Sequence, residues 1–198
     1  MNAPERLRAF PDVDAVAIGA SAGGVDALKE LLGALPADFP AAVLVVMHLP
    51  PDGWGSLPAL FAQLCALPVL EALDKQPVTG GTVLFAPPNY HLLVEPERTV
   101  SLSVDPPVLF SRPAIDPLFE SAAIVYGERL LAIVLTGASS DGSEGLAAVR
   151  RCGGHAWVQD PATAFAATMP ASALALAGAD EILTLADMCR RLSSTRPL

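Results

Sequence analysis

Two hydrophobic patterns alternate along this 198-residue chain almost from end to end. Short apolar runs predict buried strands, and segments with apolar residues three and four positions apart predict helices between them. Strands are expected at 13–18, 43–46, 130–135, 155–158 and 181–183. Helices are expected over 28–35, over 57–64, after Asp141, over 169–177 and over 185–192. This alternation predicts an α/β fold: one doubly wound, mainly parallel sheet with helices on both faces.

The middle of the chain has a different pattern. Short Pro, Gly and Asn connections separate apolar runs at 82–86, 91–94 and 99–103, which favours an antiparallel hairpin insertion around 81–103. Asp116-Pro117 then predicts a helix start, with the aspartate as N-cap and the proline at the first helical position.

We find no internal repeat and no linker in the sequence. The interpretation is therefore a single domain over 13–193, with an N-terminal tail at 1–12 and a C-terminal tail at 194–198.

The charge balance narrows the function. A net charge of −9 argues against nucleic acid, whose binders carry basic surfaces, and against an anionic membrane surface. The charged N-terminus is unlike a signal peptide, and the uncharged segment 161–179 is alanine-rich and broken by Pro170, which argues against membrane insertion. A cytoplasmic protein is expected.

The three cysteines form no recognisable motif. Cys65, Cys152 and Cys189 are scattered, which favours buried thiols in a reducing compartment. With only three histidines and no Cys/His cluster, a structural zinc site is not expected.

The first strand is followed by the turn IGASAGG, from Ile18 to Gly24. Gly19-x-Ser21-x-Gly23 matches the nucleophile elbow, in which a strand-to-helix turn presents a serine hydroxyl. As a dinucleotide-binding GxGxxG loop the turn fails, because Ser21 occupies the second glycine position. The C-terminal ends of strands in such sheets are where ligands bind, so Ser21 is a candidate nucleophile.

A nucleophilic serine needs a base and an acid that orients that base. His48 follows the second strand and is expected at the same sheet edge as Ser21. His91 lies in a hairpin strand, and His155 opens a later strand at its opposite end. His48 is therefore the candidate base, against the alternative of a partly buried structural histidine.

Asp141, in the loop after the 130–135 strand, is the candidate acid. The alternative is a variant capping box formed with Glu144, three residues later. Asp160, after the 155–158 strand, is a second candidate acid. The set Ser21, Asp141 and His155 follows the chain order of α/β-hydrolases and remains a rival triad.

An acyl-transfer site also needs donors for the oxyanion. The backbone amide of Ala22 is a candidate because it opens a helix, and a second is the amide of Ala138. Arg112 could steer an acidic partner surface, or it is a solvated loop residue.

Five motifs occur in order along residues 13–192: IGASAGG, MHLPP, RPAIDPLFESAA, LTGASSDG and ATMPASA. Together they resemble the catalytic domain of the chemotaxis-receptor glutamate methylesterases, the CheB family. The resemblance implies hydrolysis of glutamate γ-methyl esters on cytoplasmic helices of chemoreceptors, without metal or organic cofactor, and in related enzymes deamidation of receptor glutamines. It also implies a triad of Ser21, His48 and Asp141 and an oxyanion donor at Ala138.

The chain departs from the usual family pattern at three places. Ala22 replaces a threonine, Met47 replaces a glutamine or lysine, and GASSDG replaces GMGxDG. About a dozen residues precede the first strand, so no phosphoacceptor receiver domain is expected, and a separate regulatory protein is a possible partner.

Two other functions remain open. The turn from Gly19 to Gly24 could be an anion nest of a nucleotide- or phosphate-binding module. Alternatively, the altered loops could belong to a catalytically weak relative that regulates a partner.

Overall fold

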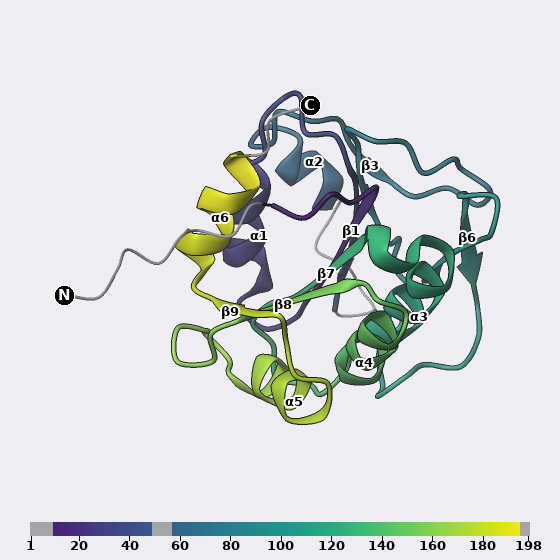
Figure 1. Cartoon of the computed structure of the whole chain (residues 1–198). Helices are drawn as coiled ribbons and strands as arrows, with labels where there is room; N and C mark the ends of the chain where they lie inside the picture. The colour runs from purple at the N-terminus through teal and green to yellow at the C-terminus, as the bar shows by residue number, and fades with distance from the viewer. Residues whose placement is uncertain (1–9, 49–56, 195–198) are drawn as a thin grey trace.

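The computed structural model describes residues 10–48 and 57–194. The expectations for the tail residues 1–9 and 195–198, and for Leu49-Pro50-Pro51 of the MHLPP motif, lie outside the described residues. The described residues form a seven-stranded parallel sheet in the order β3-β4-β2-β1-β7-β8-β9 (Figure 1). Its strands are β1 (Ala15–Ala20), β2 (Ala42–Met47), β3 (Val69–Glu71), β4 (Val83–Phe85), β7 (Leu130–Val134), β8 (His155–Gln159) and β9 (Glu181–Leu183).

Helices cover both faces of this sheet, which confirms the predicted doubly wound fold (Figure 1). One face carries α1 (Gly24–Gly33), α2 (Leu57–Phe61) and α6 (Leu185–Ser193). The other carries α3 (Ile115–Tyr126), α4 (Ser143–Arg151) and α5 (Thr168–Leu176), with the short 3-10 helix η1 (Gly127–Arg129) after α3. Successive residues of β2 alternate between the two hydrophobic cores, as side chains on a strand must.

The insertion is smaller than the sequence predicted. Among the strands that the structure describes, β5 (His91–Val94) and β6 (Val100–Ser103) pair antiparallel, and an isolated antiparallel bridge joins Pro77 and Thr99. The run expected at 82–86 instead joins the main sheet as β4, parallel to β2 and β3. All three residues of β4 are buried, which suits a central strand covered on both faces better than a hairpin strand. The strand β3 was not predicted.

Three local predictions are wrong. The helix expected over 57–64 ends at Phe61, where two amides of the following turn bond back to its carbonyl. Asp116 is not an N-cap: Ala114 takes that position with an extended backbone, and Asp116 lies buried in the first turn of α3. Cys152 is exposed, and Cys65 and Cys189 are only partly buried. Cys65 follows α2, Cys152 caps the end of α4 and Cys189 lies in α6, so none of them is in the central sheet.

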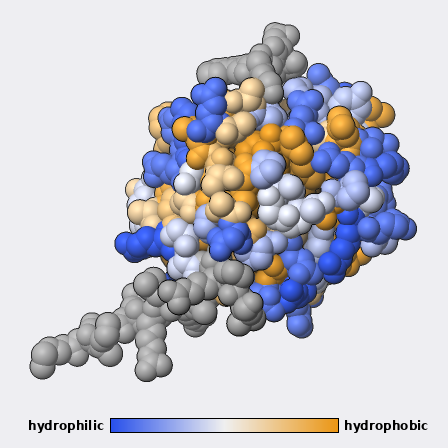
Figure 2. All heavy atoms as spheres, turned by 90° about the horizontal axis from the view of Figure 1, so that it is seen from above, coloured by the Kyte–Doolittle hydropathy of each residue, from blue (hydrophilic) through white to orange (hydrophobic). Residues whose placement is uncertain are grey.

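Among the described residues, no helix combines the length and the apolar composition needed to cross a membrane. Apolar surface is nevertheless visible in the view from above, gathered between polar margins (Figure 2). α2 and β3 lie on the upper side of the molecule, and these segments carry the exposed Leu60 and Leu70.

Candidate active site

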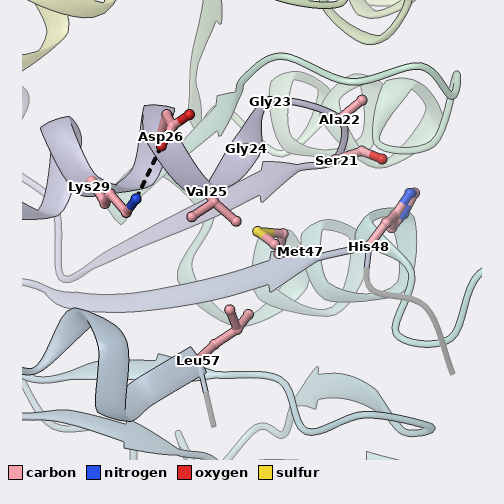
Figure 3. Close-up of a pocket in the computed structure, with 10 residues that line it drawn as sticks. All are labelled: Ser21, Ala22, Gly23, Gly24, Val25, Asp26, Lys29, Met47, His48 and Leu57. Atoms are coloured by element: carbon pink, nitrogen blue, oxygen red, sulfur yellow. Dashed lines mark hydrogen bonds and ion pairs between the residues drawn. The ribbon is translucent and has the colours of Figure 1, made fainter. Parts of the chain in front are cut away.

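Ser21 and His48 leave neighbouring strands at the same edge of the sheet. Ala20 and Met47 are the last paired residues of β1 and β2, so Ser21 and His48 are next in register. Neighbouring strands lie about 4.8 Å apart, and the His48 amide donates to the carbonyl of Ala20 at 3.1 Å. The two side chains stand beside each other at the strand ends (Figure 3). This edge is a topological switch point, since the chain runs from β1 toward β2 and later returns to β7 on the other side.

The turn that carries Ser21 is held by backbone hydrogen bonds. The Ser21 amide donates to Thr136 O at 3.0 Å, and the Gly24 amide donates back to Ser21 O at 2.8 Å. Gly23 caps α1 with φ of 78°, a left-handed conformation that favours glycine. The turn therefore exposes the serine side chain while its backbone is fixed to the neighbouring β7 loop.

Gly19, the first glycine of GxSxG, has a packing role that the sequence did not reveal. It lies inside β1, and a Cβ at this position would come within 2.5 Å of Cγ2 of Ile115. The missing side chain thus lets the start of α3 lie directly on β1.

The imidazole of His48 is bound to the candidate acid. Its Nε2 donates to Oδ2 of Asp141 at 2.6 Å, and the two side chains are 10% and 0% exposed. Within residues 10–48 and 57–194, no hydrogen bond joins the Ser21 hydroxyl to this ring. The ring nitrogen that Asp141 leaves available is Nδ1.

The start of α3 supplies two further donors to the Asp141 carboxylate. The Ile115 amide donates to Oδ2 at 2.6 Å, and the Asp116 amide donates to Oδ1 at 3.0 Å. Burial by itself raises the pKa of Asp141, but the hydrogen bonds from His48 and these two amides outweigh it and hold the pKa below its ordinary value. Asp141 is therefore ionised at neutral pH, as an acid that orients an imidazole should be.

The capping-box interpretation of Asp141 is wrong. Gly142, with φ of 93°, is the N-cap of α4, and no side chain caps that helix. The carboxylate faces His48 and the α3 amides instead.

A second buried carboxyl adjoins the first. Asp116 accepts a hydrogen bond from the Gly145 amide at 2.7 Å. Burial raises the pKa of Asp116 to about 7, and the charge of Asp141 adds to this, although the Gly145 bond opposes it. Sequence reasoning placed Asp116 in a motif but missed this position beside the candidate acid.

The rival residues lie elsewhere. His155 opens β8, at the edge of the sheet opposite to Ser21. His91 is buried, where Nδ1 accepts from the Ala114 amide and Nε2 donates to Pro106 O. Asp160 follows β8 at the correct edge, but its carboxylate accepts from the Ala162 amide in its own loop. Of the three histidines, the structure brings His48 to Asp141.

The two candidate oxyanion donors have free amides. No hydrogen bond within the described part of the chain uses the amide of Ala22 or Ala138. Thr136 lies close to both residues. Its hydroxyl donates to Ala22 O at 2.9 Å and accepts from the Ala166 amide at 2.8 Å, and Ala138 follows it by two positions. Sequence reasoning missed this threonine, whose only signal was its position directly after the β7 run.

Arg112 binds the backbone of a neighbouring loop. Its guanidinium donates to Val104 O at 2.8 Å and to Asp105 O at 3.1 Å, so it closes the loop that leads into α3.

A cavity of about 540 Å³ opens beside Ser21 and His48. Val25, Met47 and Leu57 supply apolar lining, and Figure 3 shows Met47 between Val25 of α1 and Leu57 at the start of α2. Asp26 and Lys29, paired at 3.1 Å, also line it. Among the described residues, no group of three His, Cys, Asp or Glu side chains could hold a metal ion.

Comparisons with known proteins show the family of this chain. Residues 16–192 match the family model described as CheB methylesterase. A protein of Leptospira interrogans, named provisionally as a protein-glutamate methylesterase/protein-glutamine glutaminase, is 44% identical over 87% of this chain and 89% of its own length. A Symbiobacterium thermophilum protein of the same name is also 44% identical, over 85% of this chain, which spans about half of that protein (46%).

A solved structure is also similar. The crystal structure of the Thermotoga maritima CheB methylesterase catalytic domain matches with a TM-score of 0.86 at 32% identity, over 91% of this chain and 97% of that domain.

Proposed function

The chain belongs to the CheB methylesterase family, and from this premise we propose that it is a serine hydrolase that demethylates glutamate γ-methyl esters on chemoreceptors. Because its relatives are named for both activities, the proposal includes hydrolysis of receptor glutamine side chains to glutamate. The observation that carries the proposal is the 2.6 Å bond between His48 and an ionised, buried Asp141 at the edge where Ser21 emerges.

In the proposed mechanism, Ser21 Oγ attacks the ester carbonyl and His48 takes the hydroxyl proton. Since Nε2 of His48 donates to Asp141, Nδ1 is the nitrogen that accepts this proton. Asp141 stabilises the imidazolium that forms.

The tetrahedral intermediate carries its negative charge on the former carbonyl oxygen. We assign the free amides of Ala22 and Ala138 to this oxyanion, and such donors each contribute roughly 10²–10³ in rate. The imidazolium then protonates the departing methoxy group, and methanol leaves.

Water completes the cycle. His48 deprotonates a water molecule that attacks the acyl-enzyme, and the products are the glutamate side chain and the regenerated serine. With a glutamine substrate the same steps release ammonia.

The phosphate-binding alternative has less support. Its relatives are named for ester and amide hydrolysis, and the cation among the lining residues of the cavity, Lys29, is already paired with Asp26 at 3.1 Å.

The proposal is tested by methanol release from membranes that contain methylated receptor. Ser21→Ala should lower the rate by roughly 10⁴-fold or more and abolish labelling by a fluorophosphonate probe. Ser193→Ala, at an exposed position in α6, is the matched control and should keep full activity. Undiminished methanol release by Ser21→Ala would refute the assignment.

The base is tested in the same assay. His48→Ala should lose several orders of magnitude in rate, whereas His155→Ala should not, because His155 lies at the opposite edge of the sheet. The reverse result would favour the rival triad.

A further inference from the structure

Phe165 differs from the phenylalanines of the core. The large phenylalanines of the core, Phe39, Phe61, Phe85 and Phe119, are at most 2% exposed. Phe165, in the loop between β8 and α5, is 84% exposed. The fold therefore gains little from this ring, which remains available for contact with another molecule.

The loop that presents Phe165 is held in place beside the nucleophile turn. The neighbouring Ala166 donates its amide to Thr136 Oγ1 at 2.8 Å and accepts from the Gly137 amide at 3.0 Å. The Thr136 hydroxyl in turn donates to Ala22 O. Three hydrogen bonds thus connect the residue after Phe165 to the segments that carry both candidate oxyanion donors.

The ring itself touches the nucleophile turn. A Cβ built on Gly23 would lie 2.6 Å from Cβ and 2.9 Å from Cγ of Phe165, so the aromatic side chain lies against the bare Gly23 backbone. Gly23 is two residues after Ser21, and two residues span at most about 7 Å. Phe165 therefore lies beside the nucleophile turn, next to Gly23, which lines the cavity, and this border of the cavity is called the rim.

A glutamyl ester brings its own main chain to this rim. Three bonds of about 1.5 Å separate Cα from the carboxyl carbon of glutamate, and attack requires the carbonyl within about 3.5 Å of Ser21 Oγ. The substrate Cα must then lie within about 8 Å of that oxygen. An α-helix is about 10–12 Å across, so a helical substrate at this distance places flanking side chains over the rim.

We propose that Phe165 is a specificity-determining contact that binds apolar side chains flanking the methylated glutamate on the substrate helix. The inference rests on the proposed function and adds a residue that selects protein substrates over small esters. Aromatic side chains contribute large contact area at low entropic cost, which suits such a contact.

The test compares two substrates. With methylated receptor, Phe165→Ala should raise KM and lower kcat/KM by about 10-fold, with kcat little changed. With p-nitrophenyl acetate, which has no flanking residues, its activity should equal that of wild type. Phe165→Tyr should retain the wild-type KM for receptor. Ile124→Ala, at a 79% exposed position near the far end of α3, is the matched control and should change neither substrate.

Each alternative outcome is distinct. Unchanged receptor kinetics in Phe165→Ala would overturn the inference and leave the proposed function intact. An equal loss on both substrates would also overturn it, since the ring would then support the Ser21 turn itself. Failure of the proposed function would appear separately, as receptor demethylation that survives Ser21→Ala.

Discussion

Nε2 of His48 lies 2.6 Å from Oδ2 of Asp141, although 93 positions separate the two residues. The loops after β2 and β7 meet over the end of β1, which lies between those strands. A carboxylate with no solvent exposure is tolerated there because three donors compensate its burial. This relationship underlies the first prediction.

Asp141→Asn should lower kcat for receptor demethylation by about 10³–10⁴-fold while the protein remains folded. The amide keeps the shape of the carboxylate but does not stabilise the imidazolium, and it can favour the wrong tautomer of His48. Steady-state kinetics on methylated receptor, with circular dichroism as a check on folding, measure the effect. Wild-type kcat in a folded Asp141→Asn variant would contradict the assigned role.

Gly19→Ala should destabilise the protein by about 1–3 kcal/mol and lower kcat. The new methyl group would meet the buried Ile115, whose amide donates to Asp141, so relief of the clash moves a donor away from the acid. Urea unfolding of both single variants and of Gly19→Ala/Ile115→Ala measures the coupling. The double variant should be less destabilised than the sum of the single changes, and strict additivity would show that this contact does not transmit the effect.

Asp116→Asn should flatten the decrease of stability between pH 4 and 7. The pKa of Asp116 rises from 3.8 to about 7 on folding, so over this interval the unfolded chain releases a proton that the folded chain retains. The unfolded state binds fewer protons, and the free energy of unfolding therefore falls as pH rises, then becomes level above pH 7. Asparagine keeps an acceptor for the Gly145 amide but does not titrate.

Urea midpoints at pH 5 and pH 8 check this prediction. Wild type should lose more stability than Asp116→Asn between these two values. Asp141 has a lowered pKa and acts with the opposite sign, but only below about pH 4, so it does not obscure the comparison. Equal losses in both proteins would show that Asp116 does not titrate in this interval.

Replacement of Leu109-Phe110 by Asn-Gly should stabilise the protein by about 1–2 kcal/mol. Val108 and Ser111 exchange backbone hydrogen bonds around these two residues, and both central residues have positive φ, 46° and 66°. That geometry favours Asn-Gly, and it strains leucine and phenylalanine. Phe110 is fully exposed, so its removal costs no buried contact. A lower melting temperature in calorimetry would contradict the prediction.

Local patterns predicted much of this fold. Strand runs and helix spacing are properties of neighbouring residues, so the alternation over β1, β2, β7, β8 and β9 could be read from the sequence. The same reasoning predicted that Ser21 and His48 leave neighbouring strands at one edge, because both follow a buried strand directly. The β4 run was assigned to a hairpin because its flanking Pro, Gly and Asn residues do not reveal which strand it will pair with.

The orientation of side chains at the site depends on contacts that no local pattern contains. The sequence left Asp141 between a helix cap and a catalytic acid, and only the approach of α3 to the β7 loop turns its carboxylate toward His48. The burial of Asp116 and the packing of Phe165 against Gly23 likewise depend on segments brought together from distant parts of the chain. The sequence by itself determined the strands β1, β2, β7, β8 and β9, most of the helices that alternate with them and the edge where chemistry is expected. Tertiary packing decided which carboxylate meets which histidine, because hydrogen-bond partners and burial are set by the whole fold.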